Sequence, residues 1–415
     1  MLNALARGAA AGRVTLVALL TVAAGAQVSA AQADVPSTRP APGAGHATGY
    51  VSVPGGRLYY EECGAEDAAR SAGRPALVLV HDGVMGAATW DAVWPALCAR
   101  HRVVRYDRRG KGRSPAPTAP FSQVGDMAAL LANRRVARAT VVGASAGGAL
   151  ALDFALAHPD RVERLVLVGP VVGGLPYSAH FAARERANFA PLVERGDVEA
   201  AAVRQAEDRY LLAPGSAAAR RTVLAYLRAN PQNLRGALVD GRLQERPAVP
   251  AAARLGEVRV PTLILVGEAD IPDVHAHAGA IEFGVGGARR EVMAGAGHLP
   301  QLEQPAALGE RVAAFVAATP AAAVGAERLA EAAGDYAPLV RGRPGRVRVR
   351  DGRLVAELSG EREIPLFAAD DSTFYTPVGP GLRLVVRRGS DGRAASADVT
   401  VGGATHRAVI TRPTR

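Results

Sequence analysis

The stretch Thr140–Leu150 constrains the fold of this chain more than any other segment. A β-branched apolar run ends there in the pattern Gly-x-Ser-x-Gly, and a small-residue helical pattern follows at once. This layout predicts a strand, a sharp turn that holds Ser145, and a helix. Gly143 and Gly147 suit such a turn because it leaves no room for a Cβ atom on either side of the serine. The pattern also arises by chance in a chain with 46 glycines, so an ordinary strand-to-helix turn stays open at this point.

The start of the chain indicates a secretory signal peptide. Two arginines precede the apolar run Val14–Ala26, which is too short to span a bilayer, and the small-residue motif Val28-Ser29-Ala30 follows. We therefore expect residues 1–30 to be cleaved and residues 31–48 to form a flexible leader. The mature protein is expected to be secreted or extracytoplasmic, without a stable membrane span. An uncleaved anchor is the alternative.

The basic charge of the chain does not predict nucleic-acid binding. The formal net charge of +10 falls by two, to +8, once the arginines of the acid-free residues 1–30 are removed. Lys111 is the only lysine, and the arginines are scattered among acids without a basic run interleaved with aromatics. We attribute the richness in Arg and Ala to codon composition, and the sequence leaves the oligomeric state open.

The chain has two cysteines, Cys63 and Cys98. A pair of cysteines in an exported protein invites a disulfide. The predicted elements place Cys63 at the end of an early strand and Cys98 late in the first large helix, without showing whether they come within bonding distance. We expect two buried thiols, with a Cys63–Cys98 disulfide as the alternative.

From residue 50 the sequence alternates between strand and helix patterns, which predicts a layered α/β sheet. The 415 residues allow two or three domains. A long segment between two predicted strands, about 171–258, is helical in pattern and broken by Pro and Gly. We expect it to be a helical cap over the sheet, with a decorative insertion as the alternative. The other predicted elements are the hairpin strands 51–53 and 58–62, the strands 76–80, 103–106, 140–142, 165–168 and 262–266, and the helices 90–100 and 305–317.

The C-terminal part of the chain has a different sequence pattern. After a predicted linker at 319–328, alternating apolar and polar runs are broken by turn dipeptides such as those at 351–352, 391–392 and 402–403. Such dipeptides between alternating runs favour two-residue hairpins. Residues 329–415 are therefore expected to form a small antiparallel β module.

A serine that acts as a nucleophile needs a general base, and the base needs a carboxylate that orients it. His298 lies in a loop just before the last predicted helix, and Asp270 lies just past the predicted strand 262–266. Each of Ser145, Asp270 and His298 follows a predicted strand, at the edge where open α/β sheets place their sites. Asp273 lies close behind Asp270 and is the alternative acid.

At this point the chain resembles the α/β-hydrolase superfamily over roughly residues 49–318. The resemblance implies an α/β fold with a mostly parallel sheet and a helical cap. The motifs that carry it are His81-Asp82-Gly83, Trp90, residues 107–114, the Ser145 turn, residues 267–270, and Gly297-His298-Leu299-Pro300 with Glu303 and Pro305.

The resemblance also implies roles for individual residues. Ser145 would be the nucleophile, His298 the general base and then the acid, and Asp270 the residue that orients His298. The backbone N–H groups of Gly83 and Ala146 would form the oxyanion hole. The chain order of serine, aspartate and histidine is the order of this superfamily rather than of other serine-triad folds.

One residue departs from the family pattern. Asp82 stands where relatives usually carry Gly, which would place an extra carboxylate near the oxyanion hole. Asp tolerates the unusual backbone of such a turn better than most residues do.

The expected activity is cleavage of a small ester, lactone or amide, without a cofactor or a metal. His275 and His277 are close in sequence, but no acid or Cys cluster completes a ligand set around them. A serine at residue 145 argues against dehalogenase-like and epoxide hydrolase-like chemistries, because those relatives use Asp there. The alternatives are an aminopeptidase, a carbon–carbon bond hydrolase, a cofactor-free haloperoxidase, or a binding protein that retains the three residues. The C-terminal module resembles, through residues 329–336 and Phe374, the lipocalin-like β modules found after some exported β-lactamase-like serine hydrolases, and an accessory or binding role is expected for it.

Overall fold

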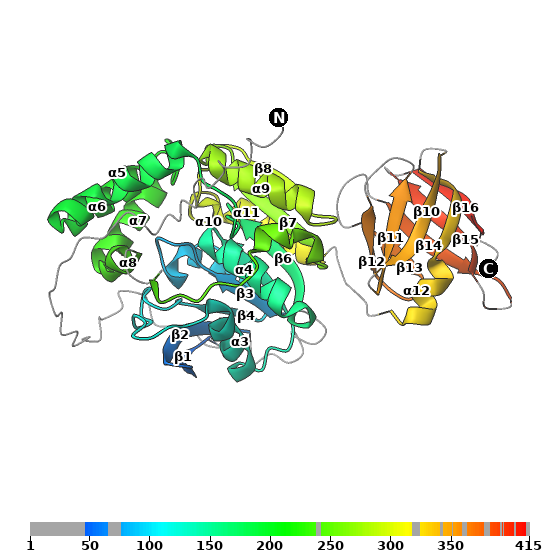
Figure 1. Cartoon of the computed structure of the whole chain (residues 1–415), viewed down its shortest axis with the longest axis horizontal. Coiled ribbons are helices and arrows are strands. Elements are labelled where there is room, and N and C mark those ends of the chain that lie inside the picture. The colour runs from blue at the N-terminus through cyan, green and yellow to red at the C-terminus, as the bar shows by residue number, and fades with distance from the viewer. Residues whose placement is uncertain are drawn as a thin grey trace, which may run out of the picture.

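A computed structural model of the protein consists of a layered α/β domain and a separate β-barrel (Figure 1). The residues it describes are 46–64, 76–237, 242–317, 324–340, 343–350, 352–358, 363–376, 382–390, 392, 394–401 and 404–411. The expected signal peptide lies outside these residues, as does the expected leader up to residue 45. Among the described residues, no helix is both long and apolar enough to cross a membrane.

The α/β domain is built on an eight-stranded sheet in the order β1-β2-β4-β3-β5-β6-β7-β8. The first two strands pair antiparallel, β2 also pairs antiparallel with β4, and the other pairs are parallel. The layered α/β sheet predicted from the alternation is therefore confirmed, as is the mostly parallel sheet that the family resemblance implies. The strands are β1 His46–Val53, β2 Gly56–Cys63, β3 Ala76–Val80, β4 Val103–Tyr106, β5 Ala139–Ala144, β6 Val162–Val168, β7 Thr262–Gly267 and β8 Arg289–Met293.

Helices cover both faces of the sheet, so the central strands are buried throughout. Alternate residues of β3 show this: Val78 and Val80 join one apolar cluster, and Leu77 and Leu79 join the other. The first cluster contains side chains of α3 (Gln123–Asn133), α4 (Ala146–Ala157) and α9 (Pro272–Gly284). The second contains side chains of α2 (Trp94–Cys98) and α11 (Pro305–Ala317).

Two predicted elements differ in detail from the structure. The helix predicted over 90–100 is a 3-10 turn, Ala87–Trp90, followed by the short α2, because Pro95 in the first turn of α2 has no N–H to continue an earlier helix. The leader predicted to reach residue 48 is wrong at its end, since β1 begins at His46, which pairs with Cys63. The sequence gives no bounds for β8, the strand before His298, because this edge strand is polar and partly exposed.

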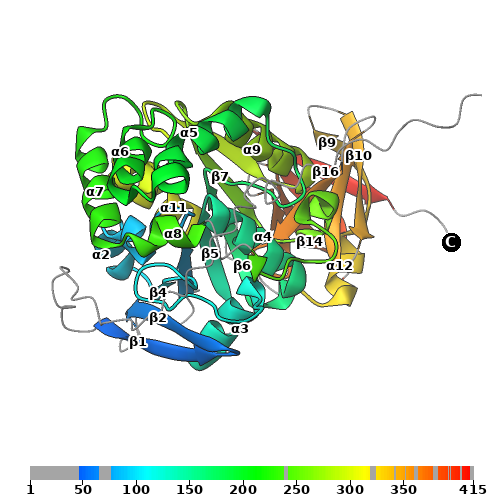
Figure 2. The same cartoon turned by 60° about the vertical axis from the view of Figure 1, so that its left-hand side comes forward.

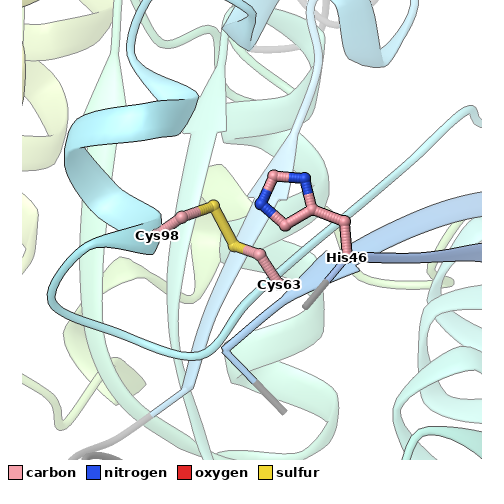
Figure 3. Close-up of side chains that lie close together, drawn as sticks. All are labelled: His46, Cys63 and Cys98. Carbon is pink, nitrogen blue, oxygen red and sulfur yellow. A yellow bond between two sulfur atoms is a disulfide. The ribbon is translucent and has the colours of Figure 1, made fainter. Parts of the chain in front are cut away.

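The expectation of two buried thiols is wrong, because Cys63 and Cys98 form a disulfide (Figure 3). Cys63 ends β2 and Cys98 ends α2, and their Cα atoms lie 5.7 Å apart, within the range that a disulfide spans. The ring of His46 lies beside the sulfur atoms. Because both sulfurs are bonded to each other, they do not offer the thiolates that a metal site with His46 would need.

The connection between β6 and β7 carries the helices of the expected cap, at one end of the molecule in both views (Figures 1 and 2). These helices have an apolar core of their own, which also takes in Met85 and Leu299 from the α/β domain. The cap is thus packed onto the loops that follow the strands. Its helices are α5 Ala179–Arg195, α6 Val198–Glu207, α7 Ala217–Ala229 and α8 Gln232–Ala237.

The C-terminal module is a closed barrel of eight antiparallel strands, which confirms the predicted antiparallel β domain. Apolar side chains fill its interior, and Tyr336 and Phe374 are fully buried there. Helix α12 (Ala326–Ala332) packs Leu329 against this core, so the predicted linker 319–328 is wrong at its end. The strands are β9 Gly334–Val340, β10 Arg343–Arg350, β11 Arg353–Leu358, β12 Ile364–Ala368, β13 Thr373–Tyr375, β14 Arg383–Arg388, β15 Ala394–Val401 and β16 Ala404–Thr411.

The barrel contacts the amino-terminal edge of the sheet. A Cβ placed on Gly286, in the turn before β8, would lie 3.1 Å from the ring of Pro365 in β12. Burial raises the pKa of Tyr375 in β13 to about 12, and the nearby charge of Arg164, close to the start of β6, lowers it. Arg164 precedes the last residue of β6, Val168, by roughly 13 Å of strand. The barrel therefore lies away from the carboxyl ends of the strands.

We expect a protein that ends at Ala323 to hydrolyse a small ester almost as fast as the full chain. The barrel contacts the amino-terminal edge of the sheet, whereas the candidate site residues follow the carboxyl ends of the strands. Its Tm is expected to fall by several degrees, because Arg164 and Gly286 become exposed to solvent. Each kcal/mol lost from the free energy of unfolding lowers Tm by ~2–4 °C. Parallel melting and esterase assays of the full chain and the truncated chain check this. A truncated protein that melts cooperatively but has lost its turnover would show that the barrel shapes the site.

Candidate active site

Ser145 occupies a strained turn between β5 and α4, as its sequence pattern predicts. Its φ of 52° and ψ of −116° lie outside the usual regions for a residue with a side chain. A Cβ on Gly143 would lie 2.3 Å from the carbonyl oxygen of Gly147, and a Cβ on Gly147 would lie 2.4 Å from that of Val80. Both glycines are therefore required by close backbone approach. The Ser145 N–H donates to the Val168 carbonyl at 2.9 Å, which fixes the turn to β6.

The structure brings together the three residues that the sequence proposed as nucleophile, base and acid. His298 Nε2 lies 2.8 Å from Ser145 Oγ, and His298 Nδ1 lies 2.8 Å from Asp270 Oδ2. Because the carboxylate accepts, Nδ1 carries the proton and Nε2 is free to accept the serine hydroxyl proton. The Asp270 side chain is fully buried, whereas the His298 side chain is 12% exposed. This arrangement can activate a serine for nucleophilic attack.

The electrostatics of His298 suit a general base. Burial alone lowers the pKa of the imidazole, but the charge and hydrogen bond of Asp270 outweigh burial and raise the pKa above its usual value. The charge of Arg184 lowers this pKa and the charge of Asp82 raises it, both by less than Asp270 does.

Asp273, the alternative acid, points to a different partner. Its oxygens accept from the backbone N–H and the hydroxyl of Ser178, at 2.6 and 2.8 Å, and so anchor the start of α5. His277 is likewise engaged within the fold, since its Nδ1 accepts from the Val172 N–H at 3.1 Å and its Nε2 faces the Pro176 carbonyl at 3.3 Å. The geometry thus favours Asp270 as the partner of His298.

The two expected oxyanion-hole residues lie next to each other. A Cβ on Gly83 would lie 3.9 Å from the Cβ of Ala146, the first residue of α4. The preceding carbonyl, that of Asp82, is held by His81 Nδ1 at 2.7 Å and by Arg108 Nη2 at 2.6 Å. In a planar trans peptide the carbonyl and the next N–H point in opposite directions. These two donors therefore fix the direction of the Gly83 N–H.

His81 can hold this carbonyl because it is neutral with its proton on Nδ1. Burial lowers the pKa of His81 well below its usual value, and the charge of Arg108 lowers it further. Its Nε2 accepts from the Arg108 N–H at 2.9 Å, which leaves Nδ1 as the donor. The sequence placed Arg108 in the 107–114 motif but gave no signal for this role, because its contacts with residues 81 and 82 are formed only by the fold.

Asp82 has a structural role that its departure from the family pattern did not suggest. Its Oδ1 accepts from the N–H groups of Val84 and Met85 at 2.7 and 2.8 Å and so closes the turn that contains Gly83. The side chain is almost completely buried. Asn233 of α8 holds the same turn from the cap, since its Nδ2 donates to the Val84 carbonyl at 3.1 Å. This contact, too, has no signature in the sequence.

The comparisons with known proteins decide the family. A family model described as the alpha/beta hydrolase fold matches residues 75–305. The chain belongs to this family. The resemblance drawn from the sequence motifs is therefore confirmed.

Relatives in this α/β-hydrolase family carry several different hydrolase names. The chain is 27% identical over 264 residues to a 2-hydroxy-6-oxo-6-phenylhexa-2,4-dienoate hydrolase from Comamonas testosteroni, which covers 60% of this chain and 86% of that protein. It is 40% identical over 114 residues to a putative carbamate hydrolase from Azorhizobium caulinodans, or 27% of this chain and 40% of that protein. Among solved structures, an esterase from Rhodococcus sp. aligns with a TM-score of 0.54 and 25% identity over 66% of this chain and 98% of its own.

We expect Asp82→Gly to lower kcat/KM for a neutral ester by about tenfold or more, since losing one oxyanion donor outright costs 10²–10³-fold. The substitution leaves the Val84 and Met85 N–H groups without their acceptor, so the turn that aims the Gly83 N–H loosens. Asp82→Asn is the matched control, because its amide oxygen can keep both bonds. Steady-state kinetics of the two variants check this. Equal or faster turnover by Asp82→Gly would show that the carboxylate does not hold the turn.

The pH dependence of hydrolysis is expected to follow His298. With the neutral imidazole as the expected base and with its pKa raised by Asp270, activity should rise with pH through an apparent pKa above about 6.5. Asp270→Asn removes that charge, so the rise should shift to lower pH and the rate should fall by about a thousandfold or more. Asp273→Asn is the control and should change neither the pH of the rise nor the rate by much. A larger loss in Asp273→Asn than in Asp270→Asn would reverse the assignment of the acid.

Proposed function

We propose that this protein is an exported serine hydrolase that cleaves a small ester, lactone or amide through an acyl-enzyme on Ser145. The observation that carries the proposal is the hydrogen-bonded series from Ser145 through His298 to Asp270, beside the backbone of Gly83 and Ala146.

The geometry supports the following sequence of steps. Ser145 Oγ attacks the scissile carbonyl while His298 Nε2 takes its proton. The N–H groups of Gly83 and Ala146 hydrogen-bond the oxyanion of the tetrahedral intermediate. His298 then gives the proton to the leaving oxygen or nitrogen, and the acyl-enzyme forms. A water molecule, deprotonated by His298, attacks the acyl group, and Ser145 leaves with the proton.

Export is supported by the Cys63–Cys98 disulfide, because disulfides persist mainly in oxidising compartments. The arginines and apolar run before residue 30 agree with a cleaved signal peptide.

The dienoate hydrolase relative favours a second candidate, which is hydrolysis of a carbon–carbon bond next to a ketone. That protein is named for a 6-oxo substrate, and this chain covers 86% of its length. The same three residues could serve such a reaction. Comparing turnover of p-nitrophenyl esters with turnover of a 6-oxo dienoate separates the two candidates.

The test of the proposed function is labelling with a fluorophosphonate probe. The exported protein is expected to be labelled at Ser145, and Ser145→Ala is expected to lose both labelling and esterase activity. The intact mass of the labelled protein also reports whether residues 1–30 have been removed. Labelling that persists in Ser145→Ala would contradict the assignment of Ser145 as the nucleophile. A mass that still includes residues 1–30 would contradict cleavage of the signal peptide.

A further inference from the structure

The backbone N–H of His298 is bound by the cap. Its N–H lies 3.0 Å from the Tyr210 carbonyl and 3.1 Å from the Leu211 carbonyl. The neighbouring Gly297 approaches the same turn so closely that a Cβ there would lie 2.8 Å from the Ala213 nitrogen. The segment 208–213, which follows α6, therefore supports the backbone of His298. We call this segment the cap turn.

Glu303 fastens the cap turn from the side of the α/β domain. One of its oxygens accepts from the Ala213 N–H at 2.7 Å and from the Ser216 hydroxyl at 2.5 Å. The other accepts from the Gly297 N–H at 2.7 Å. A single carboxylate thus joins the cap turn to the loop that carries His298.

Asp208 fixes the conformation of the cap turn itself. Its Oδ1 accepts from the Tyr210 N–H at 2.9 Å and from the Leu211 N–H at 3.3 Å. Its own carbonyl accepts from the Leu212 N–H at 3.0 Å. The residues whose N–H groups bind Asp208 are the same residues whose carbonyls hold His298. The position of the carboxylate therefore determines where those carbonyls lie.

The other oxygen of Asp208 ties the cap turn to helix α5. Oδ2 accepts from Arg184 Nε at 2.6 Å and from Asn188 Nδ2 at 2.5 Å. Hydrogen bonds between a carboxylate and a guanidinium are stronger and more directional than neutral ones. The Asp208 side chain is 4% exposed, so these bonds lie out of water. With four donors on its two oxygens, Asp208 holds the turn rigidly.

We propose that Asp208 is a positioning residue for His298: it fixes the cap turn so that the imidazole keeps its 2.8 Å contacts with both Ser145 and Asp270. The proposal rests on the function proposed above. Since donors of the cap occupy both carboxylate oxygens, Asp208 acts through His298 and does not touch the substrate. The helical cap is then part of the catalytic assembly and not only a cover.

The principal test compares Asp208→Ala with wild type. We expect kcat to fall by up to about a hundredfold with KM nearly unchanged, because a displacement of about 1 Å at a reacting group can cost that much. The rise of kcat with pH should also shift to lower pH, since an imidazole that moves away from Asp270 loses the charge that raises its pKa. Asp197→Ala is the matched control, because Asp197 caps α6 through the Ala200 N–H and is expected to leave kcat unchanged.

A rescue variant separates positioning from a direct effect of charge. Asp270, Asp82 and Arg184 all act on the pKa of His298, and the charge of His298 in turn acts on the pKa of Glu185. The Asp208 charge could therefore contribute through space. The hydroxyl in Asp208→Ser is neutral but can still accept from the Tyr210 N–H. Positioning predicts that Asp208→Ser recovers most of kcat and of the pH profile relative to Asp208→Ala, whereas a through-space effect predicts that both variants shift alike.

Each outcome bears on a different claim. Failure of the wild type to be labelled at Ser145 overturns the proposed function and leaves no reaction for Asp208 to serve. A labelled wild type together with a folded Asp208→Ala that has unchanged kcat and pH profile overturns the role of Asp208. If Asp208→Ala does not fold, Asn188→Ala replaces it, because this variant removes only one hydrogen bond to Oδ2. Asn188→Ala is expected to lower kcat by a smaller factor, and an unchanged kcat contradicts the proposal.

Discussion

The close packing of the Ser145 turn against the end of β3 is the constraint on which the rest of the site depends. Main-chain atoms approach so closely at residues 143 and 147 that only glycine fits. This contact forces a non-glycine residue to a φ of 52°, a conformation that costs about 1–3 kcal/mol. The buried strands on either side, together with the bond from Ser145 to Val168, offset that cost. The position of the serine is thus set by the sheet.

The remaining groups of the site are placed around this fixed point by main-chain contacts from three directions. The direction of the Gly83 N–H depends on the two donors that hold the Asp82 carbonyl. Asp270 follows β7, so its carboxylate is placed by the sheet as well. The N–H of His298 is bound by carbonyls of the cap, and the cap also reaches the Gly83 turn through Asn233. The barrel, which lies at the opposite edge of the sheet, contributes no described contact to these groups.

Sequence reasoning located candidate residues where a short motif and its chemistry lie together in the chain. The Ser145 turn has a local signature in its two glycines, and Asp270 and His298 each follow a strand in the expected order. It failed where a contact joins distant segments. Cys63 and Cys98 are joined only because the ends of β2 and α2 meet. Asp208 lies in no sequence motif that distinguishes it from the other acidic residues of the cap.

The central claim, that Ser145 carries the acyl group, is tested most directly by following the reaction with p-nitrophenyl acetate before steady state. The account predicts a burst of p-nitrophenol close to one equivalent per protein where deacylation is the slower step. Acid quenching during the reaction should then give a peptide acetylated at Ser145. The burst would establish that deacylation is slow. If the enzyme then turned over the ester but no acylated Ser145 could be trapped, that result would contradict the account.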